Sequence, residues 1–166
     1  MKKYELTDET KGERGVTLHR IRALVDIERY GVKAGDLGGW IESEANLDHK
    51  SEAWVFGNAR VFGEARVSGK AWVFGEAQVF GEARVSKTDH VLTVSPIGSR
   101  DDTTTFFRTK FLTGFAISVC CGCFRGTVAE FRVKVKQTHG DSKHGKAYQL
   151  AADLAETQIE LDEEEL

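Results

Sequence analysis

The chain has 166 residues, with 23 Lys and Arg, 26 Asp and Glu, and a formal net charge of −3. A chain of this length forms one ordinary domain or two small ones. Nucleic acid and anionic membranes select clustered positive charge, so this charge balance makes no case for either partner. Residues 1–15 are largely polar and no long apolar run follows, which predicts a cytoplasmic protein without a membrane span.

Residues 1–36 are predicted to form an N-terminal hairpin. Two strand-like runs, 3–7 and 16–27, flank a charged loop at 8–15. Apolar and basic residues alternate in the second run, which indicates a strand with one buried face. We expect this hairpin to cap the unpaired backbone at the open end of the segment that follows.

Residues 37–88 carry an internal repeat. Residues 53–70 and 71–88 are identical at 14 of 18 positions, and each copy consists of three six-residue units of the form Ala-x-Val-x-Gly-x, with Lys87 in place of the last Gly. Three short strands and three glycine corners would make one triangular coil, so the period predicts a short left-handed parallel β-helix of the hexapeptide-repeat kind. Residues 39–52 are interpreted as an irregular first coil, separated from the regular copies by a two-residue slip.

Residues 89–166 lose the six-residue period and are predicted to form a small α+β unit that ends in an acidic tail. Three segments have the composition of strands: 90–94, 103–108 and 115–121. Thr127 and Glu130 have the spacing of a capping box, which predicts that a helix starts at Thr127. A last helix is expected from about Ser142 onward. The predicted fold class is therefore mainly β, with a capping hairpin, a β-helix and this α+β unit.

The outward positions of the repeat are aromatic. With one coil every eighteen residues, three pairs of rings should stack and form ladders: Trp54 over Trp72, Phe56 over Phe74, and Phe62 over Phe80. Monomers rarely expose a continuous apolar surface of this size, so the ladders predict a homo-oligomer, either a dimer or a trimer. The alternatives are that the C-terminal unit covers the ladders, or that the stacked rings protect one another.

The C-terminal unit contains two candidate sites. The pairs Cys120-x2-Cys123 and His139-x4-His144 have the spacing of a two-Cys, two-His zinc site. The thiols could instead be small buried hydrophobes, or Cys121 or Cys123 could be a nucleophile with His139 as its base.

The second candidate site is the loop at Gly98, Ser99 and Arg100, which offers backbone donors, a hydroxyl and a guanidinium to a phosphate group. An ordinary hairpin turn accounts for the same residues.

Two resemblances add to these readings. The Val-Phe-Gly-Glu-Ala-Arg units within 37–88 resemble the hexapeptide repeats of left-handed β-helix proteins, whose known enzymes are trimeric acyltransferases that use a His between subunits. Here the only candidates for that role are His49 and His90, outside the regular repeats. The order of Leu37-Gly38-Gly39-Trp40-Ile41, the repeats, Cys121-Gly122-Cys123-Phe124 and Thr138-His139-Gly140 is similar to that in uncharacterised proteins of bacteriophages and prophages.

The expected function is that of a non-enzymatic binding or scaffold protein that oligomerises through its repeats. The phage resemblance implies that it acts in the host cytoplasm, where it would bind a host protein or a nucleotide signal and could inhibit a host defence. The alternative is an enzyme, either a reduced hexapeptide-type acyltransferase or a Cys/His hydrolase. A pocket that holds His139 beside a thiol would favour the enzyme, and a flat aromatic interface would favour the scaffold.

Overall fold

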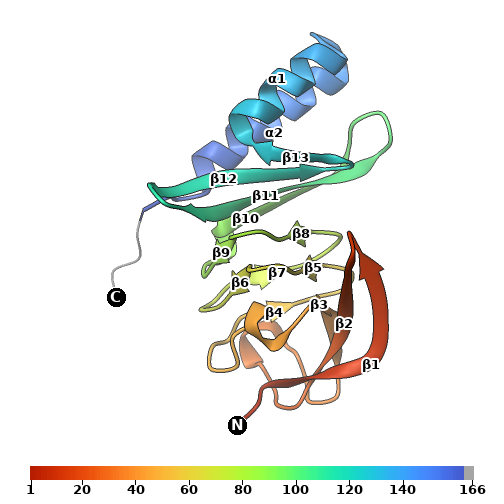
Figure 1. Cartoon of the computed structure of the whole chain (residues 1–166), viewed down its shortest axis with the longest axis vertical. Coiled ribbons are helices and arrows are strands. Elements are labelled where there is room, and N and C mark those ends of the chain that lie inside the picture. The colour runs from red at the N-terminus through yellow and green to blue at the C-terminus, as the bar shows by residue number, and fades with distance from the viewer. Residues whose placement is uncertain (163–166) are drawn as a thin grey trace. The chain divides into compact units, whose positions relative to one another are not determined.

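The computed structural model describes residues 1–162, and the chain divides into two compact units between Thr88 and Asp89 (Figure 1). The last four residues of the predicted acidic tail lie outside the described residues. Within residues 1–162, no helix has the length and hydrophobicity that a membrane span requires.

The first unit contains nine strands and two short 3-10 turns in the following order: β1 (Tyr4–Glu13), β2 (Val16–Ala23), η1 (Glu28–Tyr30), β3 (Leu37–Ile41), η2 (Glu44–Asn46), β4 (Trp54–Val55), β5 (Arg60–Val61), β6 (Arg66–Val67), β7 (Trp72–Val73), β8 (Gln78–Val79) and β9 (Arg84–Val85). A third 3-10 turn, η3 (Thr88–His90), follows β9. The charged loop predicted at 8–15 is wrong, because β1 continues to Glu13 and only Arg14 and Gly15, both with positive φ, make the turn.

The predicted left-handed parallel β-helix is also wrong as a description of the fold. The structure has several small sheets, with no long stack of parallel strands. Two of them, β4-β7 and β6-β9, hold only two strands each. The third sheet is mixed, in the order β1-β2-β3-β5-β8, because the antiparallel hairpin β1-β2 joins the parallel strands through β3. The physical reason is that the chain has only two regular copies of the repeat, so each strand finds one regular partner.

The repeat does fix the register of these parallel pairs. Three pairs lie eighteen residues apart: Trp54 with Trp72, Arg60 with Gln78, and Arg66 with Arg84. In the first coil the spacing is twenty residues, because Ile41 pairs with Val61 and Leu47 with Val67. The two-residue slip predicted from the sequence is thus confirmed.

The carbonyl group of each repeat alanine receives a hydrogen bond. Three are bonded by a backbone N–H of the preceding regular coil, at 2.9–3.1 Å: Ala71 by Trp54, Ala77 by Arg60, and Ala83 by Arg66. The carbonyl of Ala59 is bonded by the N–H of Trp40 at 2.9 Å.

The remaining two carbonyls belong to the first regular copy, next to the irregular coil, and they accept hydrogen bonds from side chains. Lys3 Nζ donates to Ala53 at 2.6 Å, and Asn46 Nδ2 donates to Ala65 at 2.9 Å. Both side chains are buried, because they replace strand partners that the irregular coil does not supply.

The second unit is an antiparallel sheet with two helices. Its elements are β10 (Val91–Ile97), β11 (Asp102–Phe111), β12 (Gly114–Cys121), β13 (Phe124–Thr127), α1 (Val128–His139) and α2 (Lys143–Gln158). The strands pair in chain order, and their apolar residues form one core with those of the helices. The predicted capping box is confirmed, since Thr127 accepts from the Glu130 N–H and Glu130 accepts from the Thr127 N–H. Ser142 caps α2 as expected.

Two corner glycines provide a test of the close approach between coils. Gly69 and Gly75 both have positive φ, at 60° and 67°. A Cβ on Gly69 would lie 2.4 Å from the carbonyl oxygen of Ser86, whereas one on Gly75 would meet nothing within 4 Å. The Ser86 carbonyl also accepts from the Lys70 N–H at 3.1 Å, which restrains it from moving away.

We therefore expect Gly69→Ala to destabilise the protein more than Gly75→Ala. The left-handed conformation alone should lower the free energy of unfolding by about 1 kcal/mol in each variant. The added steric conflict should bring the loss in Gly69→Ala to about 3 kcal/mol. Denaturant unfolding of both variants measures the difference, and equal losses would contradict the close approach.

Candidate functional site

Tyr148 on α2 connects three segments of the C-terminal unit. Its hydroxyl accepts from the thiol of Cys121, at the end of β12, at 3.8 Å. Its ring lies 5.5 Å from that of His139, at the end of α1, and stands edge-on to Phe131 at 5.7 Å. A Cβ on Gly98 would lie 1.9 Å from the same hydroxyl, so only glycine lets the β10–β11 loop approach so closely.

The environment of Tyr148 keeps its phenol protonated. Burial, and after it the interaction with Cys121 and the negative charge of Asp102, raises the pKa of Tyr148 to about 12. At neutral pH the phenol is therefore uncharged and carries its proton, so it cannot accept a proton as a base.

A cavity of about 270 Å³ opens beside Tyr148. Its apolar wall consists of Phe124, Phe131 and Val135. Polar side chains come from the β10–β11 loop, from the β12–β13 turn and from α1; they are Ser99, Arg100, Asp102, Cys121, Cys123, Lys134, Thr138 and His139. The cavity thus combines an apolar wall of mainly aromatic side chains with several polar groups, which is the usual composition of a small-molecule site.

The cavity brings together residues that the sequence assigned to separate sites. Ser99 and Arg100, predicted as a phosphate loop, line it together with Cys123 and His139, predicted as zinc ligands. Cys120 does not line it: successive strand residues face opposite sides of the sheet, and Cys121 takes the position toward Tyr148. His144 lies outside the lining, with its ring 6.1 Å from that of His139.

The zinc site stays a prediction. Among residues 1–162, no group of three or more His, Cys, Asp or Glu side chains has an arrangement that could hold a metal ion. All three cysteines are free thiols. Across the part of the chain that the structure describes, neither thiol at the cavity hydrogen-bonds to His139, and the partner of Cys121 is Tyr148.

The aromatic ladders are only partly exposed. Trp54 is 1% exposed and packs edge-on against Tyr4, while Phe62 is buried with Leu18 and Trp40. The prediction that these two positions face solvent is therefore wrong, because the N-terminal hairpin and the strand β3 cover them. Phe80 is stacked on Phe62 with its centroid 5.2 Å away, and is half-buried.

The remaining ladder rings form a partly exposed cluster with Tyr30. We call Tyr30, Phe56, Trp72 and Phe74 the aromatic surface. Neighbouring rings in it lie 5.0–6.1 Å apart, and Phe74 and Trp72 are 45% and 36% exposed. Tyr30 is held in place by a hydrogen bond from its hydroxyl to the carbonyl of Lys70.

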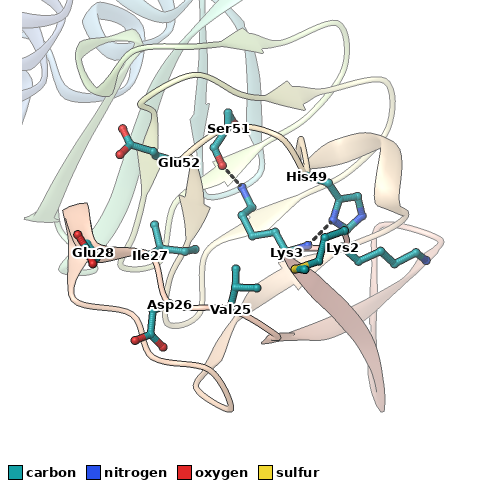
Figure 2. A pocket seen from close by; sticks show the side chains of 10 residues that line it. Lys2, Lys3, Val25, Asp26, Ile27, Glu28, His49, Ser51 and Glu52 are labelled. Carbon is teal, nitrogen blue, oxygen red and sulfur yellow. Dashed lines mark hydrogen bonds between the residues drawn. The ribbon is translucent and has the colours of Figure 1, made fainter.

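A second cavity, of about 340 Å³, lies in the first unit (Figure 2). Figure 2 shows Lys3 extending from beside His49 toward Ser51, with Glu28 and Glu52 on the far side. The N–H of Lys3 donates to His49 Nδ1 at 3.2 Å, and its Nζ donates to the Ser51 carbonyl at 2.9 Å. His49 also stacks on Tyr4 with ring centroids 4.1 Å apart.

These contacts assign Lys3 and His49 to the beginning of the regular repeat. The ammonium of Lys3 caps the carbonyls of Ser51 and Ala53, and His49 is held between Lys3 and Tyr4. Burial lowers the pKa of Lys3 to about 8, partly offset by the negative charge of Asp48. We interpret the shift as the consequence of a structural role.

The sequence matches no protein-family model and no curated protein. The resemblances drawn from the repeats and from the C-terminal motifs therefore stay untested.

Sequence reasoning missed Lys134 and Asp102 at the C-terminal cavity. The spacing of Phe131, Lys134, Val135 and Thr138 places them on one face of α1, which was a usable signal. Asp102 could be placed only once the end of the β10–β11 loop was known.

The lowered pKa of Lys3 makes stability depend on pH. Between about pH 8 and about pH 10.5 the unfolded chain holds a proton that the folded chain has released, so the free energy of unfolding should rise with pH. We expect the native protein to gain about 1–2 kcal/mol relative to Lys3→Met between about pH 7 and about pH 9.5. Lys2→Met removes an exposed ammonium paired with Glu44 and is the matched control. A parallel pH dependence of native protein and Lys3→Met would overturn the assignment.

Proposed function

We propose that this chain is a non-enzymatic binding protein that self-associates through the aromatic surface and holds its ligand in the cavity beside Tyr148. The observation that carries the proposal is the cavity itself, which is lined both by aromatic rings and by Arg100, Lys134 and His139. The bound partner would be a nucleotide or a host protein that inserts a group there. If the resemblance to phage proteins holds, binding would remove or block a component of a host defence.

A second copy of the chain is the proposed occupant of the aromatic surface. Its rings contact one another and form one continuous patch around Trp72. Two copies of the same patch are self-complementary under two-fold symmetry, and aromatic residues are enriched in the cores of such interfaces. We therefore propose a dimer in the first place, with a trimer supported only by the resemblance to hexapeptide-repeat enzymes.

One observation favours the alternative of a Cys/His hydrolase. Cys121, Cys123 and His139 line the same cavity, as a thiol nucleophile and its base would. A hydrolase would require one thiolate to form a hydrogen bond with the imidazole, whereas the thiol of Cys121 is directed to Tyr148. The binding function is therefore preferred.

Self-association can be tested by light scattering. Phe56→Ser/Phe74→Ser introduces the residue that occupies the equivalent positions Ser68 and Ser86, and should convert the assembly to monomers without unfolding the chain. Phe111→Ser is the matched control, because Phe111 is 44% exposed in the other unit and should not affect assembly. A native protein that is monomeric at high micromolar concentration, or a double variant that assembles normally, would refute the proposed interface.

The cavity's role can be tested by affinity capture from bacterial lysate, with bound proteins and small molecules identified by mass spectrometry. We expect the native chain to retain a partner or small molecule that Arg100→Gln loses. Cys121→Ser and Cys123→Ser should retain it, because the thiols have no chemical role in this proposal. If the native chain turns over a captured molecule and either Cys variant does not, the hydrolase is favoured. If the native chain and Arg100→Gln capture the same molecules, the proposed role of the cavity is refuted.

A further inference from the structure

Within residues 1–162, the positive charge at the C-terminal cavity is only partly offset by the one acidic lining residue, Asp102. Three basic residues on α1 lie two positions apart: Arg132, Lys134 and Lys136. Arg132 is paired with Asp153 and Glu156, both at 2.8 Å, and Lys136 with Asp141 at 2.7 Å. Lys134, which lines the cavity, has no ion-pair partner among residues 1–162.

Arg100, which lines the same cavity, is also without an ion-pair partner in residues 1–162. It lies in the loop that Gly98 anchors against Tyr148. The imidazole of His139 lies at the same cavity. Of the described residues, Asp102 is the one acid in the lining, and its carboxylate accepts from the Thr103 N–H at 2.8 Å. Two cations that line one cavity and have no ion-pair partner in residues 1–162 are suited to bind an anion.

The rest of the lining sets the shape of the ligand. Phe124 is half-buried at the cavity and lies 5.6 Å from Phe131, so the apolar wall offers a surface to a flat ring. Pockets for drug-sized ligands measure roughly 300–1,000 Å³. At about 270 Å³ this cavity lies just below that range, a size that suits one nucleotide-sized ligand and is small for two.

We propose that the cavity binds a nucleoside monophosphate. Arg100, Lys134 and the hydroxyl of Ser99 hold the phosphate, the base lies against Phe124, and Asp102 accepts from a hydroxyl or amino group of the ligand. This inference rests on the proposed binding function and names the ligand class for the same site. It predicts that cyclic dinucleotides, which carry two bases, bind more weakly than a monophosphate.

The test is isothermal titration of the full chain with AMP, GMP, adenosine, inorganic phosphate and cyclic di-AMP. We expect AMP or GMP to bind, and adenosine, phosphate and cyclic di-AMP each to bind about tenfold more weakly or not at all. Adenosine binding as tightly as AMP, cyclic di-AMP binding more tightly than AMP, or absence of binding by both monophosphates would each overturn the inference.

Variants locate the phosphate. Arg100→Gln and Lys134→Gln should each weaken binding of the monophosphate about tenfold and leave the weak binding of adenosine unchanged. Lys146→Gln removes the same charge from an exposed position on α2 outside the lining and should have no effect. An equal loss in Lys146→Gln would mean that the attraction is general and would overturn the site. The two proposals can fail separately. If the native chain captures a protein or an uncharged ligand that Arg100→Gln loses, and no monophosphate binds, the binding function is supported and the nucleotide inference is refuted.

Discussion

The first unit depends on one requirement, that the carbonyl of each repeat alanine has a hydrogen-bond donor. A buried carbonyl without a partner destabilises the folded state by about 1–3 kcal/mol, and six such groups lie along the repeat. The eighteen-residue register satisfies three of them with backbone N–H groups, and β3 supplies a fourth through Trp40. For Ala53 and Ala65, where the irregular coil offers no N–H, Lys3 and Asn46 are the donors.

The same requirement explains why polar residues are buried at the beginning of the repeat. Asn46 makes three hydrogen bonds: its Nδ2 donates to the carbonyls of Gly63 and Ala65, and its Oδ1 accepts from the Ser43 N–H. The burial of Lys3 lowers its pKa, which is the electrostatic consequence of using an ammonium where a strand would otherwise lie. The register also stacks the aromatic side chains, and the hairpin and β3 cover those around Phe62 but leave Phe74 exposed.

The local periodicities of the sequence predicted part of this structure. The six-residue spacing gave the parallel register and the two-residue slip, because both follow from matching side chains along one chain. Thr127 and Ser142 marked the helix starts, since capping depends on residues within one turn. The extent of parallel stacking was overestimated. The repeat period indicates which residues pair, but it does not indicate how many coils are needed to form a continuous β-helix. The extension of β1 to Glu13 was missed, since charged residues on a solvent-facing strand resemble a loop.

The candidate site was harder to predict because it joins four separate segments. Each of its parts had a local interpretation: Cys123 and His139 were predicted as metal ligands, and Arg100 as part of a phosphate-binding loop. Only the packing of the β10–β11 loop on Tyr148 places them around one cavity. The net charge of −3 was equally uninformative, because the acids on α2 neutralise Arg132 and leave Lys134 unpaired within residues 1–162. A ligand responds to the field of the few charges around it, so a weakly acidic chain can still present a site for an anion.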